Sequence, residues 1–255
     1  MRIIATINQK GGVGKTTTTL NLAHALALSG YTVLAIDADP QGNLTTSFGM
    51  DNDKASGVDA ILLDDAKIDD LMLNVRPGVN LLPAGRRLAE MEFESRGGAD
   101  RGFRLSRAIG EMAGRPDYIL IDCPPSTGLI GMNSLLAANE LLIPVSSDFL
   151  SMQGLARLLG IVDYIEDELN RQTRKWLVIT RYQDRRRLAR DIRAKLAECF
   201  PGQLLRTPVR ENVSLAESPG CGKTIFDYRS DSHGAEDYRS LAIDLVEERT
   251  ECETA

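Results

Sequence analysis

Short apolar runs alternate with longer amphipathic stretches along most of the chain. Seven of these runs have the length and the aliphatic, β-branched content of buried parallel strands. They cover residues 2–7, 32–36, 79–82, 118–121, 141–145, 176–180 and 204–207. Between most of them apolar residues recur at helical spacing, most clearly over residues 151–169, 186–200 and 235–248. The alternation predicts an α/β fold, a mainly parallel twisted sheet with helices on both faces.

The composition fits one domain of this kind. The chain has 255 residues, of which 43% are hydrophobic and 26% charged, so we expect a single domain over residues 1–255. Residues 51–76 are polar and acidic, and we expect a loop with one or two short helices there. The acidic tail, residues 247–255, is expected to be disordered. No apolar run approaches the ~20 residues of a membrane span, and no basic and apolar leader precedes the first strand.

A glycine-rich loop separates the first strand from the first helix. Residues 10–17 read Lys-Gly-Gly-Val-Gly-Lys-Thr-Thr, and a loop in this frame binds phosphate through inward backbone N–H groups and the helix N-terminus. Lys15 can reach the β- and γ-phosphates, and the Thr16 hydroxyl can hold Mg²⁺. The pattern departs from G-x-x-x-x-G-K-[ST], because Gln9 replaces the first glycine and Lys10 adds a second cation. The expected nucleotide contacts in this loop are Gly11, Gly12, Val13, Gly14, Lys15, Thr16 and Thr17.

Carboxylates follow two of the predicted strands. The second strand ends in Asp37-x-Asp39, and the fourth ends in Asp122. Each alone is ambiguous, since aspartate often ends a strand simply to support the next turn. At the carboxyl ends of parallel strands, however, they meet the glycine loop. An aspartate there holds Mg²⁺ in phosphate-loop nucleotidases, so the set predicts an ATP·Mg²⁺ site.

Four motifs, in order along the chain, carry a family resemblance. They read K-G-G-V-G-K-T-T-T, D-A-D-P-Q-G-N, D-C-P-P-S and E-N-V-S-L-A-E-S-P-G-C-G-K-T-I. Over residues 2–245 the chain closely resembles the ParA/Soj branch of the ParA–MinD ATPases, phosphate-loop ATPases with a deviant Walker A motif. The resemblance implies a Mg²⁺-dependent ATPase that forms a nucleotide-sandwich homodimer and hydrolyses ATP slowly until a partner protein stimulates it.

The resemblance also implies roles for residues at matching positions. Lys10 resembles the signature lysine that reaches across the dimer to the partner's phosphates, while Lys15 resembles the lysine that acts within its own subunit. Asp39 resembles the switch I aspartate that positions the attacking water, with Asp37 supporting Mg²⁺. Asp122 resembles the Walker B aspartate, a further Mg²⁺ ligand. Catalytic roles therefore fall to Lys10, Lys15, Asp39 and Asp122. The adenine is expected near Thr180, Arg181, Pro208 and Arg210.

One stretch of the chain is strongly basic, although the whole protein has a net charge of −6. Residues 171–195 hold ten Lys or Arg and two Asp, so the remainder carries about −14. Such a stretch is either a solvated face or a contact with a polyanion, and it lacks the aromatic residues that stack single-stranded bases. In the resembled family this region contacts double-stranded DNA without sequence preference, and Glu211 stands where a second DNA contact is expected. The DNA-binding candidates are Arg185, Arg186, Arg187 and Arg210.

These expectations combine into one function and two alternatives. We expect a cytoplasmic, nucleoid-associated ATPase that partitions or positions a plasmid, a chromosome origin or a protein assembly through a ParB-like or cargo-specific adaptor. The alternatives, on the same scaffold, are a small-molecule ligase or kinase and a reductase of the nitrogenase iron-protein type. Cys123 is a tempting ligand for an iron–sulfur cluster, but no cysteine precedes it. The tail is acidic and anionic lipid repels it, so no membrane attachment is expected.

Overall fold

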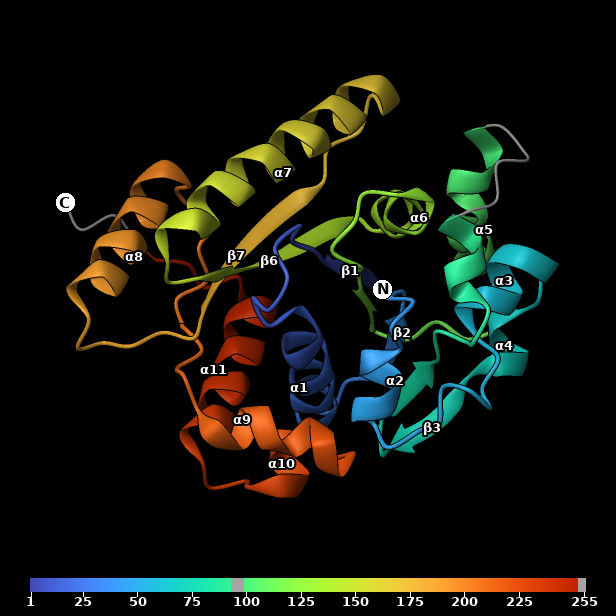
Figure 1. Ribbon diagram of the computed structural model, residues 1–255, viewed down its shortest axis with the longest axis horizontal. Coiled ribbons are helices and arrows are strands. Elements are labelled where there is room, and N and C mark those ends of the chain that lie inside the picture. The colour runs from blue at the N-terminus through green and yellow to red at the C-terminus, as the bar shows by residue number, and fades with distance from the viewer. Residues whose placement is uncertain (93–98, 252–255) are drawn as a thin grey trace.

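A computed structural model describes residues 1–92 and 99–251 of the protein. Within these residues the centre is one seven-stranded sheet in the order β3-β4-β2-β5-β1-β6-β7 (Figure 1). Neighbouring strands are parallel, apart from the antiparallel pair of β3 and β4 at one edge of the described sheet. The strands are β1 (Arg2–Thr6), β2 (Val33–Asp37), β3 (Leu73–Arg76), β4 (Val79–Leu82), β5 (Tyr118–Asp122), β6 (Glu140–Ser146) and β7 (Arg174–Thr180). The predicted α/β fold is confirmed.

Helices cover both faces of this sheet (Figure 1). One face carries α3 (Val58–Asp64), α5 (Arg104–Gly110), α6 (Leu129–Ala137), α7 (Phe149–Leu169) and α8 (Arg187–Cys199). The other carries α1 (Lys15–Leu28), α2 (Asn43–Ser47), α9 (Val213–Glu217), α10 (Ile225–Tyr228) and α11 (His233–Glu247). Shorter elements are α4 (Ile68–Leu71) and the 3₁₀ helices η1 (Leu88–Glu92), η2 (Ala99–Phe103) and η3 (Ser218–Cys221). The three clearest predicted helices correspond to α7, α8 and α11.

Burial explains why the chain forms these layers. All five residues of β2 and all five of β5 are buried, as expected for parallel strands covered on both faces, and both read as apolar runs ending in aspartate. Helix α1 lies between the sheet and α11 and is buried nearly all round, so it has no single apolar stripe. Trp176 and Tyr238, the largest fully buried side chains among the described residues, lie on the same face. This packing holds the carboxyl ends of the central strands side by side.

The edges of the sheet differ from the sequence prediction in two places. In residues 51–76 the sequence predicts a loop with short helices, and α3 and α4 lie there. The segment also ends in a strand that is not predicted, β3, which pairs antiparallel with β4. The turn between the two strands passes through Gly78, whose φ is +79°. Two of the four residues of β3 are exposed, so its apolar pattern is weak. Residues 204–207 are predicted to be a strand, but Leu204 makes only an isolated bridge to Leu177. Pro208 follows soon after and cannot donate to a ladder.

Part of the acidic tail is ordered, contrary to the prediction of disorder over residues 247–255. Glu248 pairs with Arg174, and Glu251 pairs with Arg193. The tail carboxylates therefore neutralise arginines of the basic stretch, a pairing that spans more than fifty residues and has no local sequence signal. Residues 252–255 lie outside the described part of the chain. Among the helices that are described, none is both long and apolar enough to cross a membrane.

Candidate functional site

The glycine loop joins the end of β1 to the start of α1. Gly12 (φ +74°) and Gly14 (φ +88°) take left-handed conformations that other residues rarely adopt, which is why glycine is needed there. Gly14 is the N-cap of α1, and no described side chain caps that helix end. The loop is fixed against β7, because the Thr180 hydroxyl donates to the Val13 carbonyl at 2.8 Å. Its backbone N–H groups and the helix N-terminus therefore form a preformed anion site.

Lys15 begins α1 and lies under the loop. Its side chain is largely buried, and Nζ donates to the Lys10 carbonyl oxygen at 3.4 Å, the long end of the hydrogen-bond range. Burial lowers the pKa of Lys15, while the charges of Asp122 and Asp39 partly oppose that shift. A weakly bonded ammonium in this position is ready for a stronger anionic partner such as a phosphate.

Asp122 ends β5, directly opposite Asp37 on β2 in the strand register. It is fully buried, and neither carboxylate oxygen has a hydrogen-bond partner among the described residues. Burial and the charges of Asp37 and Asp39 raise its pKa well above the ordinary value, and this shift is partly opposed by the Lys15 charge and by the Thr16 hydroxyl, which lies nearby but outside hydrogen-bond geometry. A buried carboxylate without a partner needs an explanation, and a bound cation fits the chemistry of these oxygens.

The protein oxygens here would complete only part of a cation's coordination. Within the described residues, no group of three or more His, Cys, Asp or Glu side chains forms a ready metal site. Mg²⁺ is usually held by one or two carboxylates together with substrate phosphates and water. Thr16 and Asp122, beside a phosphate loop, fit that arrangement.

Asp37 is committed to the segment that follows β2. Its Oδ2 accepts hydrogen bonds from the backbone N and the hydroxyl of Thr45, both at 2.7 Å, and its Oδ1 accepts from the Asp39 N at 3.2 Å. These bonds oppose the burial that raises its pKa to about 6. The sequence predicts that Asp37 supports Mg²⁺. In the structure its oxygens anchor α2 and the turn carrying Asp39, and the role toward Mg²⁺ stays a prediction.

Asp39 faces a cavity of about 510 Å³ over the glycine loop. One of its oxygens accepts a hydrogen bond from the Gln41 N at 3.0 Å. The residues that line the cavity are Gly11, Gly12, Gly14, Lys15, Thr16, Thr17, Asp39, Gln41, Asn43, Ser47, Pro125 and Pro219. The fold thus brings Asp39 and six of the seven predicted loop residues, all but the buried Val13, into one space.

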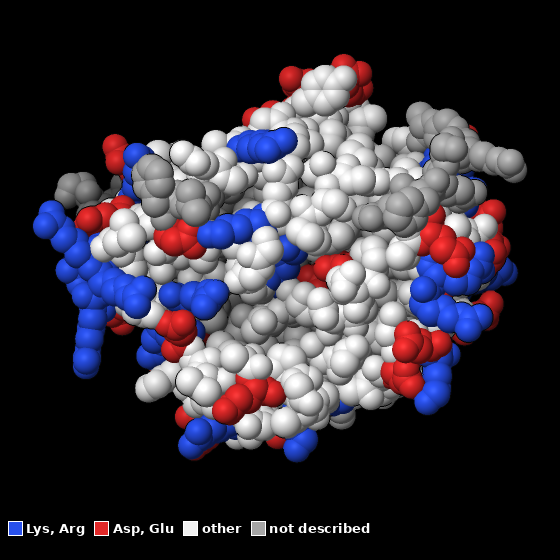
Figure 2. Space-filling view, viewed as in Figure 1, with Lys and Arg blue, Asp and Glu red and all other residues white. Residues whose placement is uncertain are grey.

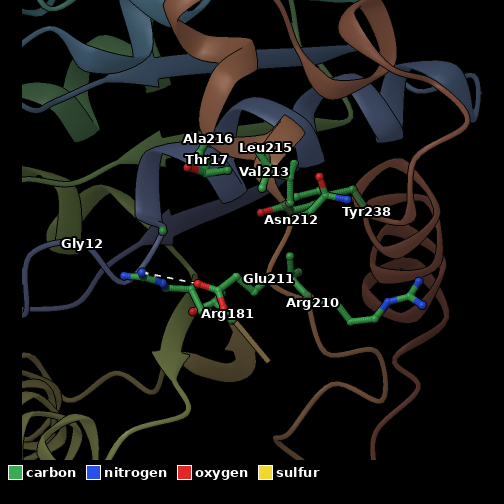
Figure 3. A pocket seen from close by; sticks show the side chains of 13 residues that line it. Gly12, Thr17, Arg181, Arg210, Glu211, Asn212, Val213, Leu215, Ala216 and Tyr238 are labelled. Carbon is green, nitrogen blue, oxygen red and sulfur yellow. Dashed lines mark ion pairs between the residues drawn. The ribbon is translucent and has the colours of Figure 1, made fainter. Parts of the chain in front are cut away.

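A second cavity, of about 490 Å³, adjoins the first and shares Gly12, Gly14 and Thr17 with it. Figure 3 shows it between the glycine loop, the segment after β7 and the segment leading into α9. Its apolar lining comes from Val209, Val213, Leu215 and Ala216, with Tyr238 from α11. An apolar slot with a few polar groups beside a phosphate loop suits a nucleoside base.

Three of the four residues expected beside the base line this cavity, namely Thr180, Arg181 and Arg210. Pro208 is not among the lining residues, and its neighbour Val209 takes that place. The Arg210 guanidinium points away from the cavity in Figure 3, toward Asp237 at 2.6 Å and Glu236 at 2.7 Å. This pairing raises the pKa of Arg210. Arg210 therefore fastens the segment before α9 to α11.

Sequence reasoning missed two further residues that line the base cavity, Asn212 and Tyr238. Asn212 caps α9 by accepting a hydrogen bond from the Ser214 N at 2.8 Å. Tyr238 is fully buried, and its hydroxyl lies 3.2 Å from that of Thr18. Asn212 precedes an apolar run, which is a recognisable N-cap signal. Tyr238 carries no signal of its own, because its spacing in α11 marks it only as a core residue.

Cys123 is poorly suited to bind a cluster. It is fully buried, and its Sγ donates to the Ile121 carbonyl at 3.7 Å. Burial and the neighbouring Asp122 raise the pKa of its thiol to about 12. Because the thiolate is the form that ligates metals, this environment disfavours the reductase alternative.

The basic stretch gathers on the loop before α8 and on α8 itself. Figure 2 shows Lys and Arg side chains projecting at the edge of the molecule where Figure 1 places α8. We use the name arginine patch for the exposed residues Arg185, Arg186, Arg187 and Arg190. Asp191 lies 3.7 Å from Arg187, and both side chains are well exposed. Arg193 and Arg210, by contrast, are paired with carboxylates on other elements.

Lys10 is held by its own subunit. Its Nζ donates to both carboxylate oxygens of Asp148, at 2.6 and 2.7 Å, and the Ser146 hydroxyl donates to the same carboxylate at 2.6 Å. The Lys10 N donates to the Asn8 side chain at 2.9 Å, and the Asn8 amide donates to the Pro144 carbonyl at 2.8 Å. The start of the glycine loop is thus fastened to the end of β6 and to the connection into α7.

Comparisons with known proteins agree with this site. The AAA domain family matches residues 1–175 of the chain. The sporulation initiation inhibitor protein Soj of Bacillus subtilis is 38% identical over 248 residues, covering 96% of this chain and 98% of Soj. The chromosome partitioning protein ParA of Myxococcus xanthus is 36% identical over 252 residues, covering 98% of this chain and 89% of that protein.

Among solved structures, cobyrinic acid a,c-diamide synthase of Mycobacterium smegmatis superposes with a TM-score of 0.81 and 32% identity. The alignment covers 96% of this chain and 94% of that one. That enzyme was solved with ADP and magnesium, and also with an ATP analogue and magnesium, which agrees with the ATP and Mg²⁺ expected here. From the ordered motifs, the parallel sheet with its glycine loop and the near full-length similarity to Soj and ParA, the chain belongs to the ParA/Soj-type family of phosphate-loop ATPases.

Proposed function

We propose that this protein is an ATP-dependent dimerising switch ATPase that partitions or positions a cargo. The observation that carries the proposal is the meeting, at one edge of the sheet, of a preformed phosphate loop and the buried Asp122 carboxylate, which has no partner among the described residues. Asp122 and Thr16 would hold Mg²⁺, which neutralises phosphate charge when it is bound. The relatives named Soj and ParA favour a partitioning role.

The chain's own residues divide the chemistry of ATP hydrolysis. Backbone N–H groups of the loop and the Lys15 ammonium bind and orient the phosphates. Asp39 orients the attacking water by accepting a hydrogen bond from it. Asp37 holds the turn that carries Asp39 by accepting hydrogen bonds from the Asp39 N and from Thr45. Asp39 is the only carboxylate in the described lining of the phosphate cavity. Hydrolysis is therefore slow and open to stimulation by a partner.

Dimerisation makes ATP a switch. In the dimer, Lys10 reaches the phosphates bound by the partner subunit, so the interface is stable only while the γ-phosphate is present. An adaptor protein, ParB-like or specific to the cargo, stimulates hydrolysis and dissolves the dimer. The family resemblance supports this cycle, and the position of Lys10 at the mouth of the loop is compatible with it.

The arginine patch supplies a second, nonspecific contact, with the phosphates of double-stranded DNA. Four exposed arginines on one loop and helix start form a sequence-independent electrostatic contact. A dimer carries two patches, so ATP raises DNA affinity by raising the effective concentration of the second patch. Binding of this kind would place the protein on the nucleoid in the cytoplasm.

The test is binding of the purified protein to random-sequence duplex DNA with ATP, with ADP and without nucleotide, at about 50 and 200 mM salt. We expect tight, salt-sensitive binding only with ATP. Reversing Arg185, Arg186 and Arg187 to Glu should abolish it and leave basal ATPase activity intact. A control with the same charge change reverses three exposed cations elsewhere, Lys54, Lys67 and Arg115, and should retain most of the binding. ATP-dependent dimers that bind no DNA would refute the DNA role.

The second candidate is a small-molecule ligase or kinase, which the 32% identity to cobyrinic acid a,c-diamide synthase favours. A ligase activates a carboxylate substrate with ATP, so its ATP turnover depends on an acceptor molecule. The partitioning role predicts instead that DNA together with an adaptor protein raises turnover. Turnover that responds only to cobyrinic acid and an amine donor would decide for the ligase.

A further inference from the structure

Lys10 and Asp148 form an ion pair within one subunit, beside the phosphate loop. The pair is bidentate, since both carboxylate oxygens of Asp148 accept from the Lys10 ammonium, at 2.6 and 2.7 Å. We propose that Asp148 is a positioning residue that holds Lys10 in the monomer and sets the threshold for ATP-dependent dimerisation. The proposal rests on the proposed function, in which Lys10 acts across the dimer.

The carboxylate is itself held in a fixed position. The Ser146 hydroxyl, at the end of β6, donates to Asp148 at 2.6 Å, and Asp148 directly precedes the first residue of α7. The backbone of Lys10 is fixed separately, because its N donates to the Asn8 side chain. The pair therefore joins the start of the phosphate loop to the connection between β6 and α7. Neither partner needs to move for the pair to form in the monomer.

The two destinations of Lys10 compete. An ammonium bonded to both oxygens of a carboxylate in its own subunit cannot at the same time reach across an interface to a phosphate. Each protomer must open this pair before its lysine contacts the partner's nucleotide. A conformation that binds only after such an opening has its apparent affinity reduced by the fraction of molecules already open.

The cost of separating Lys10 and Asp148 is small. The Lys10 side chain is 33% exposed and the Asp148 side chain 45% exposed, so water solvates both groups once they separate. The freed carboxylate also lies at the N-terminus of α7, a helix of 21 residues whose dipole stabilises a negative charge there. Asp148 thus has an alternative partner when Lys10 leaves. The contact acts as a reversible competitor of the dimer.

The expected effect follows from the strength of exposed ion pairs. Each such pair contributes a factor of about 1.4 to 5 to an equilibrium constant. A dimer opens two of them, so removing Asp148 should tighten ATP-dependent dimerisation by about 2- to 30-fold. A purely structural role would instead leave the dimer constant unchanged or weaken it.

The test is the dimer dissociation constant in Mg²⁺ and a non-hydrolysable ATP analogue, measured by analytical ultracentrifugation for wild type and Asp148→Asn. Asp64→Asn is the matched control, because Asp64 forms a comparable half-exposed ion pair with Arg87 at 2.8 Å far from the loop. Ser146→Ala should change the constant in the same direction as Asp148→Asn, but by less. Thermal unfolding of each monomer verifies the fold.

A double-mutant cycle isolates the role of the pair. Lys10→Ala should itself weaken or abolish the dimer, and in that background Asp148→Asn should not strengthen or restore it, because the competing ammonium is gone. The proposal is overturned if the wild type dimerises and Asp148→Asn does not tighten the dimer, or if Asp148→Asn tightens it equally in the Lys10→Ala background. Either result leaves the proposed switch function intact. Absence of an ATP-dependent dimer in wild type and in Asp148→Asn overturns both.

Discussion

Replacing Asp122 by asparagine is expected to stabilise the nucleotide-free protein and, at the same time, to remove its response to Mg²⁺ and ATP. The two effects have opposite signs because the buried carboxylate destabilises the fold when no cation is bound, but serves as a ligand when a cation is present. Asp122 is fully buried, it has no hydrogen-bond partner among the described residues, and Asp37 and Asp39 lie close enough to raise its pKa. Asparagine keeps the shape of the side chain and removes the charge.

The magnitude follows from the cost of the unpaired group. Burying a polar group without a hydrogen-bond partner costs about 1–3 kcal/mol, and burying a charged one costs more. The asparagine amide would still carry part of this cost, because it too is polar and buried. We expect Asp122→Asn to raise the free energy of unfolding at pH 7.5 by about 1–3 kcal/mol, or the Tm by about 2–12 °C for a chain of this size. The gain should be smaller at pH 5. A carboxyl whose folded pKa is raised adds stability at low pH that is lost as the pH rises through that pKa.

The assay is thermal unfolding followed by circular dichroism, at pH 5 and 7.5, with and without Mg²⁺ and a non-hydrolysable ATP analogue. Wild type should gain about 2.7 kcal/mol at a ligand concentration of 100 Kd, and Asp122→Asn should lose most of that gain. Asp231→Asn is the control, since that side chain is 87% exposed. A nucleotide-free Asp122→Asn protein that unfolds at or below the wild-type temperature at pH 7.5 would refute the reasoning.

Three further predictions test neighbouring parts of the site. Gly222→Ala should lower the free energy of unfolding by about 1–3 kcal/mol in urea titrations, because φ there is +63° and a Cβ would lie 2.8 Å from the Gly49 Cα; an unchanged midpoint would contradict this. Asp39→Ala should reduce phosphate release by at least about 100-fold and leave nucleotide affinity within a few-fold, whereas normal turnover would remove its assigned role. The raised pKa of Asp37, about 6, should lower the free energy of unfolding by on the order of 3 kcal/mol as the pH rises from about 4 to 7. Asp37→Asn should make this decline shallower in denaturant titrations at several pH values. An equally steep decline in the variant would exclude Asp37 as its cause.

Local chemistry made the phosphate loop readable from the sequence. Glycines at the two left-handed positions, Gly12 and Gly14, are required by the backbone itself, and the strand before them and the helix after them have short-range patterns. Asp39 and Asp122 were readable for a related reason, since each directly follows a buried apolar strand. Parallel strands bring such residues to one edge of the sheet wherever they lie in the chain.

Residues whose role depends on distant partners were not readable in this way. Arg210 is predicted to contact the base and DNA, but its guanidinium is taken up by Asp237 and Glu236 on α11. Tyr238 lines the base cavity and reads only as a core residue. Each of these assignments needs the docking of α11 against α1, and no local pattern reports that contact.

The sequence by itself determined the α/β alternation, six of the seven strands of the described sheet, the glycine loop and the identity of the carboxylates at the strand ends. These features follow from backbone conformation and from burial patterns that repeat within a few residues. The tertiary structure alone decided which charged side chains have hydrogen-bond or ion-pair partners. It pairs Lys10 with Asp148 and Asp37 with Thr45, and it leaves Asp122 buried without a partner among the described residues. Electrostatic pairing depends on distances across the fold, and spacing along the chain does not encode those distances.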